Sequence, residues 1–400
     1  MKVIVLLGDG MSDVACQELG NKSPLQAANI PNMDFMARNG LTGLAHTVPQ
    51  GLPPGSDVAN LSVFGYDPRN CYTGRSPLEA ISMGVSLGSA DVAFRMNLVT
   101  LKPRGSSLYM EDFSAGHITT DEARELVADL QRQLGDDEFE FHSGVGYRHL
   151  MVWRGGRDGM KSTPPHDITG RAVLDHLPKG EGADRLISIM NSCQMVMHNH
   201  PVNRKRTESG QLPANSAWLW GHGKTPKIET YREKFGLSGA VISAVDLIKG
   251  IGVCAGLDII AVEGATGYID TNYLGKAQAA LAALEDHDFV YVHVEAPDEA
   301  SHSGRMDHKI RAIEDFDRLV VGTVREGIKK FDDYAILCTP DHPTPVHLMT
   351  HTSDPVPFIV YRGGAGESNG ALSYCEEQAR ITGLVVEGHR LMEMLLNRKS

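Results

Sequence analysis

The chain has 400 residues, which is enough for two or three domains and for a large core that folds without disulfides or structural metal. Hydrophobic residues make up 42% and charged residues 22%, and this composition excludes a disordered chain. The net charge is −12, without a block of Lys and Arg, which argues against non-specific binding to nucleic acid. An anionic substrate would therefore need local positive charge from a metal or from arginine.

The cysteines and the apolar runs indicate the compartment. The six cysteines are scattered and form no Cys-x-x-Cys pair, which suits a reducing environment. The N-terminal apolar run, residues 3–7, stops at Gly8-Asp9-Gly10 and is too short for a signal peptide. No run approaches the roughly 18 apolar residues that a membrane span needs. We therefore expect a cytoplasmic protein with no membrane partner.

The first hundred residues alternate strand and helix signals. Residues 3–7 form a continuous apolar run, which is typical of a strand covered on both faces. The other predicted elements are a helix from Pro31 to about residue 40, a strand over 41–48, a short helix over 58–64 and a capping box over 76–79. A tight Gly/Pro loop that contains Ser56 precedes the short helix.

The middle of the chain has a different pattern, which favours a separate α+β unit. Its predicted strands span 91–101, 139–142 and 149–153, and its predicted helices run from Thr120 to 133 and over 186–197. Residues 154–178 are rich in Gly, Pro and charge, and residues 199–213 are polar and basic, so both stretches are predicted to be loops.

Strand and helix signals alternate again from about residue 239. The predicted strands are 239–243, 289–294, 334–338 and 357–361, and the predicted helices are 271–285, 308–330 and 385–397. This alternation predicts an α/β fold with a mostly parallel sheet and helices on both faces. We expect one catalytic domain built from residues 1–100 and 240–400, with a smaller α+β domain inserted over 101–239.

Carboxylate and imidazole side chains follow the predicted strands of the first and last segments. They are Asp9, Asp298, His302, Asp341, His342 and His351. Because the carboxyl ends of parallel strands lie along one edge of a sheet, we expect these loops to converge. Each motif alone is as well explained by a turn or a helix cap, but together they favour a metal site. Carboxylates and imidazoles without thiolate suit Mn²⁺, Zn²⁺ or Mg²⁺, and six ligands are too many for one ion, so two metals are expected.

Ser56 is a candidate nucleophile because it stands in a Pro-Pro-Gly-Ser turn before a predicted helix. A serine at this position is also a common helix N-cap, and the two roles do not exclude each other. The amides of a helix N-terminus favour a phosphate group, and nearby cations make the serine hydroxyl easier to deprotonate.

Several long motifs resemble archaeal-type cofactor-independent phosphoglycerate mutase, of the alkaline phosphatase superfamily. They include Leu-Gly-Asp9-Gly-Met-Ser-Asp, Pro-Gly-Ser56-Asp-Val-Ala-Asn-Leu-Ser-Val-Phe-Gly-Tyr-Asp-Pro, Tyr72-Thr-Gly-Arg-Ser-Pro-Leu-Glu-Ala and Phe94-Arg-Met-Asn-Leu-Val-Thr. The later motifs are Glu295-Ala-Pro-Asp-Glu-Ala-Ser-His, Thr339-Pro-Asp-His-Pro-Thr-Pro and His351-Thr-Ser-Asp-Pro-Val-Pro-Phe. The resemblance extends over nearly the whole chain.

The resemblance implies a role for each motif. Asp298, His302 and His351 would hold one metal ion, and Asp9, Asp341 and His342 would hold the other, with Ser56 as both nucleophile and ligand. The inserted domain would be a substrate-binding cap. Within the looser match there, His117 and Arg148 resemble cap positions that bind substrate, and Lys276 resembles the family's active-site lysine. The metals would be Mn²⁺ by first choice, with Mg²⁺ or Zn²⁺ as alternatives, and no 2,3-bisphosphoglycerate would be needed.

The expected activity is the interconversion of 3-phosphoglycerate and 2-phosphoglycerate through a phosphoserine on Ser56. A closed cap would keep water away, because otherwise the enzyme would act as a phosphatase. Relatives of similar length resemble a subgroup proposed to phosphorylate homoserine, and the shared metal and serine motifs do not separate the two activities. A homoserine kinase-like transferase and a metal-dependent phosphohydrolase are therefore the alternative functions.

Overall fold

The computed structural model describes residues 1–363 and 367–397. Contacts between Cα atoms divide the chain into two compact units, Met1–Tyr72 with Lys227–Ser400 and Thr73–Pro226. Within the described residues, none of the helices has the length and apolar character needed to cross a membrane.

The first unit is built on an eight-stranded sheet of order β11-β10-β12-β1-β13-β14-β2-β15. Its strands are β1 (Lys2–Gly8), β2 (Leu41–His46), β10 (Gly239–Ile242), β11 (Asp258–Ile259), β12 (Phe289–Val294), β13 (Tyr334–Thr339), β14 (Val356–Arg362) and β15 (Val385–Glu387). β14 runs antiparallel to both of its neighbours, and the remaining neighbours in this sheet pair in parallel. The predicted mostly parallel sheet is therefore confirmed.

Helices surround this sheet. They are α1 (Pro24–Ala27), α2 (Pro31–Arg38), α3 (Ser56–Val63), α4 (Pro68–Cys71), α9 (Tyr231–Lys234), α10 (Asp246–Cys254), α11 (Tyr273–Asp286), α12 (Ala296–His302), α13 (Met306–Asp315), α14 (Gly322–Gly327), α15 (Glu376–Ile381) and α16 (Leu391–Leu395). The predicted helix over 308–330 is present as α13 and α14 joined by a π-helical segment, Phe316–Val321.

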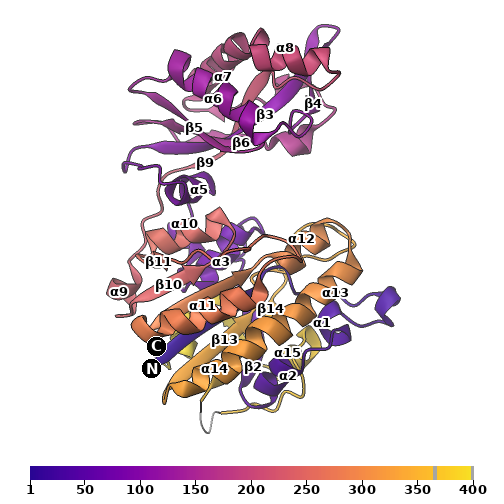
Figure 1. The fold of residues 1–400 in the computed structure, drawn as a ribbon, viewed down its shortest axis with the longest axis vertical. Coiled ribbons are helices and arrows are strands. Elements are labelled where there is room, and N and C mark those ends of the chain that lie inside the picture. The colour runs from indigo at the N-terminus through magenta and orange to yellow at the C-terminus, as the bar shows by residue number, and fades with distance from the viewer. Residues whose placement is uncertain (364–366, 398–400) are drawn as a thin grey trace. The chain divides into compact units, whose positions relative to one another are not determined.

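Side chains alternate between the two faces of the sheet. Ile4 and Leu6 of β1 point to one face and pack in a core with residues of α2, α11 and α13. In Figure 1, α11 and α13 lie in front of the strands on that face. Tyr291 of β12 points to the other face, where its ring stacks on Phe64 with centroids 4.0 Å apart. Both faces are covered, which explains why the central strands are continuous apolar runs.

The parallel strands β1, β12 and β13 end at one edge of the sheet. Gly8 pairs with Val294 and Leu7 pairs with Thr339, so the chain leaves all three strands at nearly the same level. The loops that begin there carry Asp9, Glu295 and Asp341. This register positions the candidate site.

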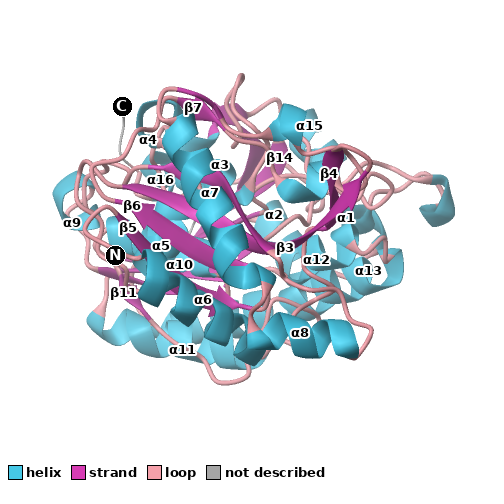
Figure 2. Cartoon of the chain, turned by 90° about the horizontal axis from the view of Figure 1, so that it is seen from above, coloured by secondary structure: helices cyan, strands magenta, loops and turns pink. Residues whose placement is uncertain are grey.

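The second unit has a five-stranded antiparallel sheet of order β4-β3-β6-β5, with β9 paired to the other side of β3. Its elements are α5 (Ser76–Ser82), β3 (Val92–Arg104), β4 (Ser107–Asp112), α6 (Thr120–Leu134), β5 (Phe139–Val145), β6 (Arg148–Trp153), β7 (Met160–Lys161), β8 (Lys179–Gly180), α7 (Ala183–His198), α8 (Pro201–Glu208) and β9 (Ser216–Gly223). Figure 2 shows α6 and α7 lying across this sheet, and their apolar residues share one core with it.

The second unit begins earlier than the predicted boundary at residue 101. It starts at Thr73 because β3, which begins at Val92, is the central strand of this sheet and not part of the first one. The C-terminal boundary also moves, from 239 to Pro226, because β10 pairs with β12 of the first unit. Strands β4 and β9 were not predicted, and both are defined by their pairing with β3.

The predicted loop over 199–213 is wrong. Residues 201–208 form α8. This helix is rich in basic residues, but some of its side chains are buried. The Arg206 side chain is 3% exposed. It donates hydrogen bonds to the Glu122 carboxylate at 2.7 Å and to the Ala115 carbonyl at 2.7 Å, which satisfies the buried guanidinium.

Two predicted helix starts also differ from the structure. The predicted helix over 385–397 begins as the edge strand β15, because pairing with β2 outweighs local helix preference. Ser76 begins α5 but does not form the predicted capping box. Its hydroxyl accepts a hydrogen bond from the Arg95 amide at 2.8 Å and donates one to the Gly221 carbonyl.

Candidate active site

The structure brings seven of the predicted site residues together at the carboxyl edge of the first unit's sheet. They are Asp9, Ser56, Asp298, His302, Asp341, His342 and His351. Asp9 follows β1, Asp341 and His342 follow β13, and α12 carries Asp298 and His302 four residues apart on one face. The rings of His342 and His351 stack with centroids 3.9 Å apart, which joins the cluster into one site.

Asp298, His302 and His351 form the first group of candidate ligands. The Nδ1 atoms of His302 and His351 lie 2.9 Å from the Met349 carbonyl and 3.0 Å from the Pro54 carbonyl. A carbonyl only accepts, so each Nδ1 carries a proton, and a ring that gives up its second proton has its lone pair on Nε2. The two Nε2 atoms lie 2.8 Å apart, and that of His302 is 3.2 Å from the Asp298 carboxylate. Converging lone pairs beside a carboxylate suit a bound cation.

The charges of this first group favour the same interpretation. Hydrogen bonding to Asp298 raises the pKa of His302 to about 9. Burial disfavours the charge on Asp298, but hydrogen bonds from His302 and His351 outweigh it and hold the pKa of that carboxyl well below its usual value. Asp298 is therefore an anion that either a proton on His302 or a metal ion can neutralise.

Asp9, Asp341 and His342 form the second group. The His342 Nε2 atom lies 3.5 Å from Asp9 Oδ1, 3.3 Å from Asp341 Oδ2 and 3.2 Å from the Ser56 hydroxyl. Burial lowers the pKa of His342, so its ring is neutral and can act as a ligand. Burial and the neighbouring carboxylates of Asp341 and Glu295 raise the pKa of Asp9. Asp9 Oδ1 is buried without a hydrogen-bond partner among the described residues, as expected for an atom that contacts a cation.

These residues fit divalent metal ions. The potential ligand atoms of Asp9, Asp341 and His342 lie within 4.8 Å of one another, and so do those of Asp298, His342 and His351. His342 therefore stands between the two groups. The donors are carboxylate oxygens and imidazole nitrogens, which suit Mn²⁺, Zn²⁺ or Mg²⁺.

Ser56 is the first residue of α3 and lies beside the second group. Its side chain is buried, and Asn60, one turn later, fixes its surroundings. The Asn60 amide donates to the Ser56 carbonyl at 2.9 Å and to Asp341 Oδ2 at 2.7 Å. Tyr291 in turn donates to the Asn60 side-chain oxygen at 2.6 Å. Sequence reasoning missed Asn60 and Tyr291, because their roles depend on contacts between α3 and β12.

Lys309 connects the loops that carry the two groups. Its fully buried ammonium donates to Asp13 Oδ2 at 2.9 Å and to the Thr344 carbonyl at 2.8 Å. The Thr344 hydroxyl donates to Asp298 Oδ1 at 2.6 Å. This buried ion pair therefore holds the loop after β1 and the loop after β13 in one arrangement.

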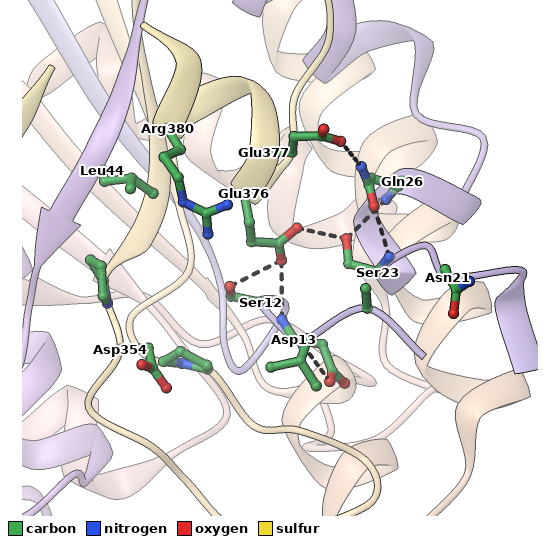
Figure 3. A pocket seen from close by; sticks show the side chains of 14 residues that line it. Ser12, Asp13, Asn21, Ser23, Gln26, Leu44, Asp354, Glu376, Glu377 and Arg380 are labelled. Atoms are coloured by element: carbon green, nitrogen blue, oxygen red, sulfur yellow. Dashed lines mark hydrogen bonds between the residues drawn. The ribbon is translucent and has the colours of Figure 1, made fainter. Parts of the chain in front are cut away.

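Glu376 of α15 also holds the loop after β1 in place through hydrogen bonds (Figure 3). Its carboxylate accepts hydrogen bonds from the Ser12 hydroxyl at 3.0 Å, the Asp13 amide at 3.1 Å and the Ser23 hydroxyl at 2.6 Å. The cavity of about 520 Å³ beside these residues is lined by none of the seven candidate residues. We assign Glu376 a structural role.

The three predicted substrate-binding residues lie in different places. Lys276 of α11 is buried in the first unit, where its ammonium donates to the His293 carbonyl at 2.9 Å, and burial lowers its pKa to about 8. His117 and Arg148 belong to the second unit. Both lie near Tyr147: the His117 ring is 6.4 Å from the Tyr147 ring, and the Arg148 guanidinium is 5.5 Å from it.

His293 and Glu295 were not among the predicted ligands, yet both lie beside Asp9. His293 Nε2 is 2.8 Å from Asp9 Oδ2 and 3.6 Å from Glu295 Oε2. His293 lies within the apolar strand β12, so its position in the sequence indicated only a strand. A signal was present, because an imidazole in a fully buried strand needs polar partners.

Comparisons with known proteins identify the family. A family model described as 2,3-bisphosphoglycerate-independent phosphoglycerate mutase matches residues 37–203. A Geobacter sulfurreducens protein named as a probable 2,3-bisphosphoglycerate-independent phosphoglycerate mutase is 67% identical over 399 residues, which covers 100% of both chains. The 2,3-bisphosphoglycerate-independent phosphoglycerate mutase of Methanosarcina barkeri is 50% identical over 405 residues, again across 100% of both chains.

Solved structures agree with these relatives. The cofactor-independent phosphoglycerate mutase from Thermoplasma acidophilum matches with a TM-score of 0.70 at 28% identity, over 99% of both chains. A protein from Pyrococcus horikoshii matches with a TM-score of 0.85 at 30% identity, over 100% of this chain and 98% of that one. Because relatives of 50% identity and more span the full length, the chain belongs to the 2,3-bisphosphoglycerate-independent phosphoglycerate mutase family.

Proposed function

We propose that this enzyme interconverts 3-phosphoglycerate and 2-phosphoglycerate, without 2,3-bisphosphoglycerate, by passing the phosphoryl group through Ser56. The names of the full-length relatives support the reaction. The observation that carries the route is the position of the Ser56 hydroxyl, 3.2 Å from His342 Nε2 and at the N-terminus of α3. The relatives give no support to the homoserine kinase or phosphohydrolase alternatives.

Two divalent metal ions, Mn²⁺ by first choice, are part of the proposal. Asp298, His302 and His351 would hold one ion. Asp9, Asp341, His342 and Ser56 would hold the other. When bound, the ions offset the negative charge of the phosphoryl oxygens and make the serine hydroxyl easier to deprotonate.

The protein's own groups would carry out the transfer. Ser56 Oγ forms a bond to phosphorus while the ester bond between phosphorus and glycerate oxygen breaks. The proton lost from Ser56 balances the proton that the departing glycerate hydroxyl gains. The N-terminus of α3 would favour the phosphoryl anion on Ser56. Glycerate then reorients, and its other hydroxyl takes the phosphoryl group from Ser56.

The second unit would act as the cap that keeps glycerate bound and water out. His117 and Arg148 would bind the substrate anion there, and Lys276 would do so from the first unit. A guanidinium can bind a carboxylate through two parallel hydrogen bonds, which suits the carboxylate of glycerate. Without the cap, water would hydrolyse the phosphoserine and the enzyme would release phosphate.

The test uses 3-phosphoglycerate and Mn²⁺ without 2,3-bisphosphoglycerate, with product coupled to enolase and free phosphate measured in parallel. We expect an enolase-dependent signal with little free phosphate. Ser56→Ala should lower kcat by about 10³-fold or more, because the covalent step is lost. The exposed Ser209→Ala is the matched control, with unchanged rate.

Three results would contradict the proposal. Phosphate release faster than isomerisation would indicate a hydrolase. ADP formation from ATP with homoserine, without isomerisation, would indicate a kinase. Trapped phosphate on a residue other than Ser56, read by mass spectrometry, would reject the nucleophile.

A further inference from the structure

Asn60 joins the backbone of the proposed nucleophile to a carboxylate of the second group. Its side chain is fully buried. Its amide nitrogen lies 2.9 Å from the Ser56 carbonyl oxygen and 2.7 Å from Asp341 Oδ2. A carbonyl and a carboxylate both accept hydrogen bonds, so this end of the amide must be the nitrogen, and both of its protons are used. One side chain therefore connects the first turn of α3 to the loop after β13.

Tyr291 of β12 fixes the orientation of that amide. Its hydroxyl lies 2.6 Å from Asn60 Oδ1, and an amide oxygen only accepts, so Tyr291 donates. A flipped amide would place its oxygen against the Asp341 carboxylate, where two acceptors repel each other. The ring of Tyr291 stacks on Phe64, the residue after α3, with 13° between the ring planes. Tyr291 therefore contacts α3 at two points that are one helical turn apart.

The two oxygens of Asp341 are held by different parts of the chain. Oδ1 accepts hydrogen bonds from the Gly10 amide at 3.2 Å and from the His342 amide at 2.9 Å, which are backbone contacts. Oδ2 accepts from the Asn60 side chain. A change at Asn60 would therefore release one oxygen of Asp341 and the carbonyl of Ser56 together. Such a release matters because a displacement of about 1 Å at a reacting centre can lower a rate by about 10²-fold.

We propose that Asn60 and Tyr291 are positioning residues for the phosphoryl transfer. Tyr291 orients the amide of Asn60, and Asn60 sets the position of Ser56 relative to Asp341. This role rests on the proposed function, because it requires Ser56 to be the attacking group. Neither positioning residue binds the substrate in this scheme, so its loss should lower kcat and leave KM unchanged.

The alternative is that the two residues only pack α3 against the sheet. Tyr231 of α9 separates the two roles. Like Tyr291, it is fully buried, and its hydroxyl donates a hydrogen bond to the Phe64 carbonyl at 2.8 Å. That bond lies at the end of α3 opposite Ser56. Removing either hydroxyl deletes one buried hydrogen bond at this helix, so the two variants should lose similar stability.

The experiment compares the two tyrosines in the full-length enzyme. Tyr291→Phe should lower kcat by about 10-fold, the effect expected of one hydrogen bond, with KM within about twofold of wild type. Tyr231→Phe should keep kcat within about twofold of wild type. Enolase-coupled kinetics measure kcat and KM, and the rate of phosphate trapping on Ser56 follows the covalent step. Urea denaturation of each variant measures its stability.

A double variant tests whether Tyr291 acts through Asn60. Asn60→Leu removes both donated hydrogen bonds and should lower kcat by about 10²-fold. Adding Tyr291→Phe to Asn60→Leu should then cause no further loss of kcat, because the amide that Tyr291 orients is already absent. If Asn60→Leu does not fold, the comparison of Tyr291→Phe with Tyr231→Phe decides the matter alone.

Several results would overturn the positioning role. They are a wild-type kcat in Tyr291→Phe, equal losses of kcat in Tyr291→Phe and Tyr231→Phe, and a raised KM at unchanged kcat. A further loss in the double variant would also overturn it, since Tyr291 would then act independently of Asn60. Failure of the proposed function is distinguishable, because it would be seen in the wild type as an absence of phosphate on Ser56.

Discussion

Each unit of the chain contains a cluster of charged side chains, and the two clusters differ in composition. At the sheet edge of the first unit, the carboxylates of Asp9, Asp298 and Asp341 are all buried. In the second unit, guanidinium groups gather around the single carboxylate of Glu79. Arg75 lies 2.7 Å from it and Arg95 lies 3.3 Å from it.

The pKa shifts of the two regions express the same contrast. Burial and the neighbouring carboxylates of Asp341 and Glu295 raise the pKa of Asp9. Burial also opposes the charge on Glu79, yet Arg95, Arg75 and Arg148 keep its pKa below the usual value. The first region is therefore suited to cations, and the second, with its excess of arginine, is suited to an anion.

The largest expected effect follows from removing a carboxylate of the first region. Asp341→Asn should lower kcat by about 10³-fold or more, because a lost metal contact removes several kcal/mol of charge stabilisation. Metal analysis and kcat, measured with saturating Mn²⁺, check this result. The exposed Asp332→Asn is the control. Full activity after exhaustive chelation would contradict a metal-dependent site.

The second-largest expected effect concerns Lys309, whose ion pair with Asp13 supports the loops of the first region. Lys309→Met should destabilise the protein by about 3–5 kcal/mol, because it leaves Asp13 buried without its partner. Urea denaturation measures this change, and adding Asp13→Asn should recover part of it. The exposed pair of Lys329 and Glu326 provides the control, since Lys329→Met should cost less than about 1 kcal/mol. Equal midpoints for the two lysine variants would show that Lys309 does not hold the loops.

A smaller effect is expected in the arginine-rich region. Arg148→Ala should raise KM for 3-phosphoglycerate by about 10–100-fold, as expected for the loss of a charged hydrogen bond, while bound Mn²⁺ stays unchanged. Steady-state kinetics and metal analysis distinguish this from a loss at the metal centre. Arg124→Ala, an exposed arginine of α6, should leave KM unchanged. An unchanged KM for Arg148→Ala would remove that residue from the substrate site.

The smallest effect is a pH dependence of the metal-free protein. The folded protein binds the His302 proton more tightly than the unfolded chain does, because hydrogen bonding to Asp298 raises the pKa from 6.5 to about 9. The resulting stability is present below pH 6.5 and is lost as the pH rises through about 9. Melting temperatures of metal-free wild type and His302→Asn should therefore differ more at about pH 6 than at about pH 9.5.

A histidine elsewhere serves as the reference for this pH series. His198→Asn, at the exposed end of α7, should keep the wild-type pH dependence. Parallel curves for His302→Asn and wild type would show that the proton on His302 does not stabilise the fold.

Much of the first unit was predictable from local patterns. The run at residues 289–294 predicted β12 with its observed bounds, because a strand covered on both faces is apolar throughout. The stretch after it, with Asp298 and His302 four residues apart, was recognisable as a potential ligand pair because one turn of helix separates the two. The second unit was less predictable, since β9 depends on pairing with β3 from a distant position in the sequence.

The sequence by itself determined the alternation of strands and helices, the residue types at the strand ends and the family resemblance. Local periodicity and short motifs encode these features. Only the tertiary structure placed His293 and Glu295 beside Asp9, Asn60 against Asp341, and Lys309 between two loops. Those contacts join residues separated by hundreds of positions. They depend on the parallel register of β1 with β12 and β13, which no local pattern specifies.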